Sequence, residues 1–323
     1  MNASVAITGG SIVAPSGDML PVDSLPAEWR ERVARVERVS ALALVGGFRA
    51  CRQAGIGVAS DVRRERAGIA VGTAFGCLLT NAEFQRRVAA GGPAAASPRL
   101  FAATVSNAAA GELGIALGFA GPSITLTAGG ASGTVALGHA AALIDGGAAD
   151  LLLAGGVDAL GPALEAFLGA RGLDVGVPPR EVAALAILER ADEARRRGAR
   201  VRGLVIGHGT GFEPDPRAAD AGRGLAHAVE RALDGASGDV AAVACAASPA
   251  MRALALRVVA SVLGRPVERL AFGEDVGHSL GASGAEAMLH ALESTASGET
   301  VLIVDACASG HAAALAVRVG DAP

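Results

Sequence analysis

Cysteine is scarce in this sequence, and its distribution excludes several classes of protein. The four cysteines are scattered along 323 residues without the paired spacing of a metal site. A disulfide framework is equally unexpected in a chain of this length with so few thiols. We therefore expect a reduced, cytoplasmic protein without a metal. The four positions are Cys51, Cys77, Cys245 and Cys307.

Long runs of one residue class are also missing. No basic block occurs, and the net charge of −4 with a pI near 5.9 argues against nucleic acid as a partner. No apolar run approaches the roughly 18 residues that a membrane span requires. The first residues lack the charged start and long apolar core of a signal peptide. We expect neither a membrane span nor a secretory signal.

Apolar and small residues, in contrast, are abundant. Hydrophobic residues make up 51% of the chain, charged residues only 19%, and there are 45 glycines but no tyrosine. This composition allows a large core and close packing of backbone elements. It predicts one large domain or two fused halves.

The stretch from Gly121 to Asp158 has the clearest pattern in the chain. It predicts a half-buried strand, a glycine turn, a helix buried on all sides and a strand covered on both faces, in that order. These elements are Ser123–Ala128, Gly129–Gly130, Gly133–Asp145 and Leu151–Val157.

The turn before the buried helix is the position with most chemical meaning. Helix amides converge there, so a thiolate at this point would be stabilised, as an acyl-transfer nucleophile requires. Gly130 stands at this position instead. On the helix that follows, His139 is predicted to be a core histidine with its hydrogen bonds satisfied.

Elsewhere, the periodicity predicts alternating strands and helices. The predicted strands are Val5–Ile7, Ala67–Thr73, Val182–Glu189, Val201–Gly207, Val240–Ala246, Val301–Ala306 and Ala313–Val319. The predicted helices are Val39–Ala54, Asn81–Ala90, Pro98–Leu113, Leu225–Leu233, Ala250–Leu263 and Ala285–Leu292, with a helix or turn at Arg190–Ala199. Turns or loops are predicted at Gly9–Gly10, Gly161–Pro179, Gly209–Gly224 and Phe272–Gly284.

The order of these elements repeats. Three predicted strands in the first half correspond to two strands and a loop near Phe272 in the second half. This repetition predicts a duplicated α/β unit with helices between two sheets. We expect an N-terminal half over residues 1–160 and a C-terminal half over residues 161–323, joined in one compact globular unit.

Several segments together resemble the β-ketoacyl synthases. They run in the order of that family from Gly68 to Leu315, and the ordered set is highly specific although no single segment is. The segments are GIAVGTAFG, SPRLFAATVSNAAAGELGIALGFAGPSITLTAG, ADLLLAGGVDAL, EVAALAILERADEARRRGARVRGLVIG, GHSLGASGAEA and LIVDACASGHAAAL. The resemblance implies the thiolase fold, a duplicated five-layer α-β-α-β-α arrangement.

The same resemblance implies that most of the catalytic residues are absent. Catalytic members use a cysteine, two histidines and a lysine, and three of these positions hold Gly130, Ala244 and Gly273 here. Only the second histidine is retained, as His278. In the gate loop, Ala308 stands where the family has a phenylalanine that screens the nucleophile.

Such a chain resembles the chain-length factor of type II systems, a subunit that lacks the cysteine and pairs with a cysteine-bearing ketosynthase. The resemblance implies a heterodimer, an acyl carrier protein as a further partner, and acyl-phosphopantetheine bound mainly by the ketosynthase rather than a cofactor of this chain. A product of polyketide, polyene or fatty-acid-like type is expected, with an aryl polyene system as one possibility. The residues expected to shape the acyl tunnel and the subunit interface are Phe101, Val105, Asn107, Ile124 and Leu126.

Two other functions stay open from the sequence. One is a self-sufficient decarboxylase or acyltransferase that uses His278 with Cys307, Cys245 or Ser132. The other is a homodimeric acyl-binding scaffold. The residues themselves also have structural interpretations: Ser132 as a helix cap, the cysteines as inert buried thiols, the motif around His208 as a loop, and Glu274 and Asp275 as surface carboxylates.

Overall fold

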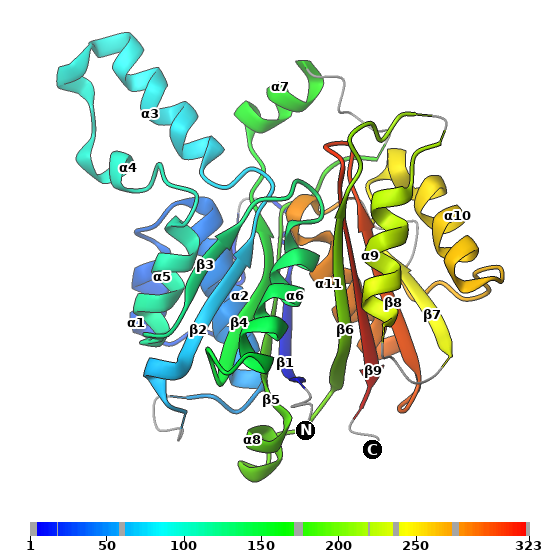
Figure 1. Cartoon of the computed structure of the whole chain (residues 1–323). Coiled ribbons are helices and arrows are strands. Elements are labelled where there is room, and N and C mark those ends of the chain that lie inside the picture. The colour runs from blue at the N-terminus through cyan, green and yellow to red at the C-terminus, as the bar shows by residue number, and fades with distance from the viewer. Residues whose placement is uncertain are drawn as a thin grey trace.

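The computed structural model describes residues 5–17, 19–57, 62–170, 177–218, 220–234, 239–272 and 278–320. Over these residues nine strands pair in one mixed sheet (Figure 1). The strands are β1 (Val5–Val13), β2 (Ala67–Gly72), β3 (Ser123–Leu126), β4 (Leu151–Asp158), β5 (Val182–Arg190), β6 (Gly203–Phe212), β7 (Val240–Cys245), β8 (Thr300–Ala306) and β9 (His311–Val319).

Helices connect the strands and cover the sheet. The α-helices are α1 (Ala27–Val33), α2 (Arg38–Gln53), α3 (Leu78–Gly91), α4 (Pro98–Ala102), α5 (Ala108–Leu117), α6 (Ser132–Asp145), α7 (Pro162–Ala170), α8 (Ala191–Arg196), α9 (Arg223–Leu233), α10 (Arg252–Leu263) and α11 (Ser283–Ser294). Short 3₁₀ turns are η1 (Arg64–Arg66), η2 (Pro93–Ala95), η3 (Pro249–Met251) and η4 (Leu280–Ala282).

The sheet consists of two groups of strands with the same internal pairing. The strand order is β3-β2-β4-β5-β1-β6-β9-β8-β7. In the first group β2 is parallel to β4, and β5 is antiparallel to both β4 and β1. In the second, β7 is parallel to β8, and β9 is antiparallel to β8 and β6. A parallel bridge from Val243 to Leu270 stands where β3 pairs with β2 in the first group.

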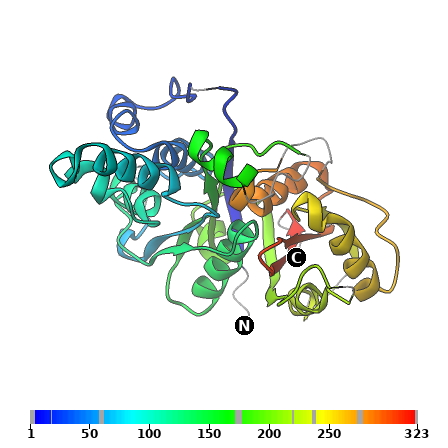
Figure 2. The ribbon, with the colours of Figure 1, turned by 90° about the horizontal axis from the view of Figure 1, so that it is seen from above.

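These contacts confirm the duplicated five-layer α-β-α-β-α arrangement. Helices α6 and α11 lie between the two groups of strands: α6 contacts β2, β4, β6 and β9, and α11 contacts β4, β5, β7 and β8. Helices α2 and α5 cover the outer face of the first group, and α9 and α10 cover the second, as the views in Figures 1 and 2 show. The division of the chain after residue 160 stays a prediction; β5, which follows it, lies in the first group.

Small residues bring the central helix close to its neighbours. A β-carbon on Gly133 would lie 2.6 Å from the carbonyl oxygen of Gly281, and one on Gly156 would collide with the same oxygen. Larger side chains at these two positions would therefore push α6 and the η4 turn away from the sheet. The helix is not buried on all sides, because His139 and Ala142 are exposed. The prediction of a core histidine at His139 is therefore wrong.

Two predicted strands are longer than their patterns indicate, and glycines explain both. β1 continues through Gly9 and Gly10 with a bulge after Ile7, and a β-carbon on Gly9 would strike the carbonyl oxygen of Ala50 in α2. β6 continues through His208 to Phe212. In β6 the glycines at 207, 209 and 211 each face backbone atoms of α9. They permit a close approach of helix and strand, where a loop was predicted.

Two helix predictions also need correction. The predicted helix Pro98–Leu113 is two helices, α4 and α5, separated by residues 103–107. The predicted loop Gly161–Pro179 contains the helix α7, whose Leu164 and Leu168 are buried. Helix α3 and the short α4 project from the body, as Figure 1 shows, and in α3 only Thr80 is buried.

Candidate functional site

The glycine turn lies where β3 ends and α6 begins. Gly129 has φ +57°, a left-handed conformation that glycine adopts without strain. The buried hydroxyl of Ser132 accepts a hydrogen bond from the amide of Ala128 at 2.8 Å. The same hydroxyl lies 3.0 Å from the carbonyl oxygen of Thr73 and 2.6 Å from that of Gly129. Ser132 therefore fixes the turn and ties it to β2.

Three separate segments meet beside Gly130. A β-carbon on Gly130 would lie 3.3 Å from Cβ of Cys307, in the loop between β8 and β9. It would lie 3.6 Å from Cε1 and 3.8 Å from Nε2 of His278, which precedes η4. The position predicted for a nucleophile and the retained histidine are thus brought together, and Cys307 joins them.

The ring of His278 presents one hydrogen-bond donor to this space. The amide of Leu280 donates to Nδ1 at 3.3 Å, so in the neutral ring the proton is assigned to Nε2. Nε2 is buried and has no partner among the described residues. Burial, together with the charge of Arg180, lowers the pKa of His278 to about 4. The ring is therefore a neutral donor at physiological pH.

An ion pair helps to hold the backbone of His278 in place. Arg180 donates two hydrogen bonds to the buried carboxylate of Glu286 in α11, at 3.0 and 2.9 Å. The amide of Arg180 also donates to the carbonyl oxygen of His278 at 2.9 Å. The segment before β5 and the segment before η4 are thereby fixed to one helix.

Asp158, at the end of β4, connects two further walls of the site. Its buried carboxylate accepts hydrogen bonds from the amides of Ala74, Phe75 and Gly281 and from the hydroxyl of Thr73, at 2.7 to 3.0 Å. Burial raises the pKa of Asp158, and these hydrogen bonds oppose that shift. Four donors on one carboxylate make this a positioning group for the loop after β2 and for η4.

A cavity of about 510 Å³ opens next to Gly130 and His278. Apolar side chains from α7, the loop after β2, the segment before β5 and η4 form most of its wall, and Cys307, Ala308 and Ser309 form one side. The apolar wall and the single ring donor suit an uncharged ligand with one acceptor group. Its apolar lining residues include Phe75, Leu168, Val177, Pro178, Pro179 and Leu280.

The other predicted site positions fall in different places. Ala244 is fully buried in the core on β7 and does not line the cavity. Gly273, Glu274 and Asp275 lie outside the described residues. His208 is on β6, and its ring lies against Gly138 of α6, so its motif belongs to a strand rather than to a loop. Of the four catalytic positions that the resemblance predicts, His278 and Gly130 line the cavity.

The three alternative nucleophiles differ in their access to the cavity. Ser132 is fully buried, and its hydroxyl already contacts backbone groups on both sides. Cys245 is buried in the outer core between the second strand group and its helices. Cys307 lines the cavity. Its Sγ lies 3.0 Å from the Ser309 hydroxyl, so Cys307 is the alternative nucleophile that has access to the site.

The predicted tunnel and interface residues gather near one edge of the sheet. β3 is the edge strand, and Ile124 and Leu126 on it are half-buried. Phe101 and Val105 are 64% and 49% exposed, although both are apolar, and Asn107 is also exposed. The ring of Phe101 packs against Phe84 of the projecting α3, with centroids 5.7 Å apart.

Several residues of the site were not identified from the sequence. Asp158 closes an apolar strand with a single carboxylate, a pattern that could have marked it. The partners Arg180 and Glu286 are 106 residues apart, so their pairing is not visible in the sequence. The complete lack of lysine is visible in the sequence, and it means that the family's lysine has no counterpart anywhere in the chain.

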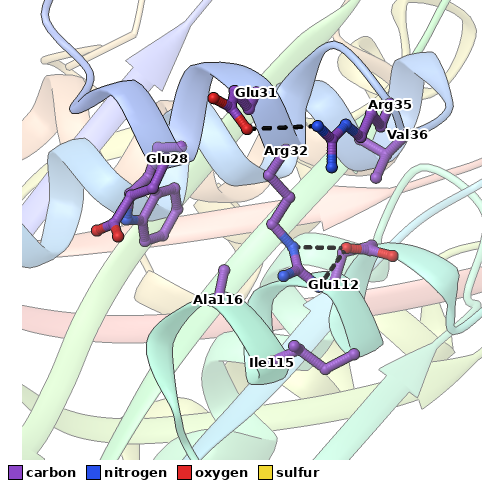
Figure 3. Close-up of a pocket in the computed structure, with 9 residues that line it drawn as sticks. Glu28, Glu31, Arg32, Arg35, Val36, Glu112, Ile115 and Ala116 are labelled. Carbon is purple, nitrogen blue, oxygen red and sulfur yellow. Dashed lines mark hydrogen bonds and ion pairs between the residues drawn. The ribbon is translucent and has the colours of Figure 1, made fainter.

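A larger hollow, of about 650 Å³, lies between α1 and α5, away from these groups (Figure 3). Charged side chains dominate it, and Arg32 pairs across it with Glu112 at 2.8 Å. It has no thiol and no histidine, so we place the functional site at the smaller cavity. The lining residues are Glu28, Trp29, Glu31, Arg32, Arg35, Val36, Glu112, Ile115 and Ala116.

Neither a membrane-spanning helix nor a metal centre occurs within the described part of the chain. None of the helices there has the length and apolar character that crossing a bilayer demands. No group of three or more histidine, cysteine, aspartate or glutamate side chains is arranged there to hold a metal ion. The four cysteines are free thiols.

Comparisons with known proteins agree with the fold. A family model described as the N-terminal domain of β-ketoacyl synthases matches residues 22–173. No curated protein matches the sequence. Among solved structures, AntDE:AntF, described as a type II PKS acyl-carrier protein in complex with its ketosynthase bound to the hexaketide, matches with 21% identity and a TM-score of 0.84 over 99% of this chain and 100% of that chain.

Two other structures are similarly close. The ishigamide ketosynthase/chain length factor has 22% identity and a TM-score of 0.82, over 98% of this chain and 100% of that chain. A β-ketoacyl synthase from Burkholderia phymatum has 20% identity and a TM-score of 0.82, over 99% of this chain and 100% of that chain. Residues 22–173 therefore match the N-terminal domain of the β-ketoacyl synthases, and the whole chain has the thiolase-like fold seen in the ketosynthase structures.

Proposed function

We propose that this chain is the non-condensing, chain-length-factor-type subunit of a heterodimeric ketosynthase. In this proposal a cysteine-bearing ketosynthase performs the condensation, and this chain shapes the acyl tunnel at their common interface. The observation that carries the proposal is glycine at the start of α6, directly beside a retained histidine.

The chemistry of condensation explains why this observation matters. A thiolate must hold the growing acyl chain, and hydrogen-bond donors must stabilise the enolate that forms when a malonyl unit loses CO₂. Gly130 has no side chain, the chain has no lysine, and Ala244 offers neither a proton nor a hydrogen bond. Losing the nucleophile of such a unit lowers the rate on the order of 10⁶-fold. One neutral histidine does not compensate for that loss.

The open edge of the sheet supports a partner subunit. β3 has a neighbour on one side only among the described residues, and unpaired edge strands readily pair with a second chain. Exposed Phe101 and Val105 lie in the nearby α4–α5 segment, and Ile115 of α5 is 68% exposed. Apolar side chains at an edge strand favour a permanent interface over a solvent-facing surface.

The kinds of partner are supported by the structural relatives. One of them is described as a ketosynthase with its acyl-carrier protein, and another as a ketosynthase/chain length factor. We therefore propose a cysteine-bearing ketosynthase and an acyl carrier protein as the partners of this chain. The acyl-phosphopantetheine would be bound mainly by the ketosynthase, and the product would be of polyketide or polyene type.

Co-expression with a cysteine-bearing ketosynthase tests the proposal. We expect the two chains to co-purify in equal amounts, and Ile124→Asp to abolish co-purification because it places a charge on the β3 edge. Leu270→Asp is the matched control, since Leu270 lies beside β7 at the opposite end of the sheet and is 41% exposed. A stable homodimer that does not bind the ketosynthase would instead indicate an acyl-binding scaffold.

Product length tests the tunnel residues separately. In the proposed complex Phe101 and Val105 face the growing chain and limit its length. Phe101→Ala should then lengthen the products of the complex, as read by mass spectrometry. Phe212→Ala is the matched control, because Phe212 is 56% exposed but lies at the end of β6, in the other strand group. Unchanged product length in Phe101→Ala would remove Phe101 from the tunnel.

A further inference from the structure

We propose that Cys307 is an acyl-acceptor thiol, which takes an apolar acyl group from a thioester inside the cavity beside Gly130. This function goes beyond the proposed role in a heterodimer, because it needs only the residues of this chain. It assigns to the loop between β8 and β9 a covalent site that the start of α6 does not provide.

The position of the thiol is the first observation. Of the four cysteines, only Cys307 contributes to the described lining of the cavity. Its Sγ lies 3.0 Å from the Ser309 hydroxyl and 3.5 Å from the carbonyl oxygens of Ala128 and His311. A hydroxyl at this distance can donate a hydrogen bond to a thiolate, which stabilises the reactive form.

The buried Nε2 atom of His278 is the second, independent observation. Its Nε2 is unpartnered among the described residues. Cβ of Cys307 and Nε2 of His278 lie 3.3 and 3.8 Å from one point, the place where a β-carbon on Gly130 would be. A carbonyl group bound at that point lies beside the side chain of Cys307, whose Sγ is 3.0 Å from the corresponding point on Gly129, and faces the His278 donor on its other side. An orphaned donor in an apolar wall is satisfied by such an acceptor.

The reaction is a thiol–thioester exchange. The sulfur of Cys307 attacks the carbonyl carbon, a new carbon–sulfur bond forms, and the Nε2 proton of His278 hydrogen-bonds to the oxygen that gains charge. The bond to the original thiol then breaks, and the departing thiolate takes up the proton that the Cys307 thiol lost. His278 keeps its own proton throughout, because its Nδ1 accepts the Leu280 amide.

The cavity also defines the class of acyl group. Its wall is mainly apolar, and it contains no lysine that could bind a carboxylate. Glu165 lies on α7 at the same cavity, so a negatively charged acyl group would be repelled. Short, uncharged aliphatic acyl thioesters therefore fit, and malonyl-type thioesters do not.

Incubation of the purified chain with the hexanoyl thioester of N-acetylcysteamine tests this proposal. We expect intact mass to show one hexanoyl group per chain and peptide mapping to place it on Cys307. The lack of lysine simplifies the assignment, because no side-chain amine competes. The malonyl thioester should leave the chain unmodified.

Variants separate the site from general thiol reactivity. Cys307→Ser should abolish the adduct, whereas Cys77→Ser should keep it. His278→Ala removes one donor to the carbonyl oxygen and should slow acylation on the order of 10²-fold. Ala308→Phe leaves the thiol in place but fills the cavity, and should slow acylation at least about tenfold. Melting temperatures show which variants remain folded.

Two results would overturn the proposal. One is the absence of an adduct on the folded wild-type chain, and the other is an adduct on a residue other than Cys307. Neither result bears on co-purification with a ketosynthase, so the failure of this proposal and the failure of the proposed function are distinguishable.

Discussion

Replacing Gly129 or Gly130 by alanine adds the same methyl group to the same turn, yet we expect very different stabilities. Gly129 has φ +57°, and its β-carbon would lie 2.6 Å from Oγ of Ser309 and 3.0 Å from Sγ of Cys307. The left-handed conformation costs alanine about 1–2 kcal/mol. Displacing the Ser309 hydroxyl adds to that, so Gly129→Ala should lose about 2–3 kcal/mol of the free energy of unfolding.

An alanine at position 130 needs no left-handed conformation and displaces no neighbouring group. Gly130 is not among the positive-φ glycines, and the nearest atom to its β-carbon would be Cβ of Cys307 at 3.3 Å. Alanine there reduces the entropy of the unfolded chain by about 0.4–1 kcal/mol, which offsets a slightly tight contact. We expect Gly130→Ala to stay within about 1 kcal/mol of the wild type.

Urea unfolding followed by circular dichroism measures both variants against the wild type. A difference of 1 kcal/mol corresponds to only about 1.5 °C in melting temperature for a chain of 323 residues, so urea unfolding is the more sensitive measurement. If Gly130→Ala loses as much stability as Gly129→Ala, the fold itself requires glycine at 130. In that case Gly130 would be explained by the fold alone and would not be evidence that this chain lost a nucleophile.

Three further predictions concern buried charges. Burial raises the pKa of Asp305 well above its usual range, so the free energy of unfolding falls as the pH rises above about 4. In urea unfolding, Asp305→Asn should be more stable than the wild type at pH 8 but not at pH 4. The pKa of His278 is lowered to about 4, so the free energy of unfolding rises between about pH 4 and 6.5. An NMR titration that finds a pKa near 6.5 for His278 would contradict this. Glu286→Ala removes the buried carboxylate that pairs with Arg180 and should cost about 3 kcal/mol. Asp239→Ala at an exposed pair should cost under about 1 kcal/mol. Both values are measured by urea unfolding.

Much of the fold was accessible from the sequence because its elements have strong patterns. β4 is an uninterrupted apolar run, and all eight of its residues are buried. α6 lacks charge until Asp145 and lies between the two strand groups. Where local pattern and burial agree in this way, the type of element follows from the residues alone.

The failures have a common physical cause. Glycines in β1 and β6 resemble turn signals locally, but they are there because α2 and α9 press against the strands. The sequence of a strand does not show that a helix packs closely against it. The exposure of His139 is likewise decided by what covers α6, and not by the composition of α6.

The site was predictable only in part for the same reason. Gly130 and His278 were identified by their place in recognisable segments, and the structure brings them together. The walls are positioned by Asp158, Arg180 and Glu286, whose partners are more than 80 residues away in the sequence. No local sequence pattern indicates such pairs. Cys307 could be named as a candidate, but its access to the cavity could not.

Elongation by the chain alone and by its complex with a ketosynthase is the most direct test of the central claim. Both samples receive an acyl-loaded and a malonyl-loaded carrier protein, and the products are read by mass spectrometry. The account predicts elongated product from the complex and none from the isolated chain above background. Elongated product from the isolated chain would contradict it.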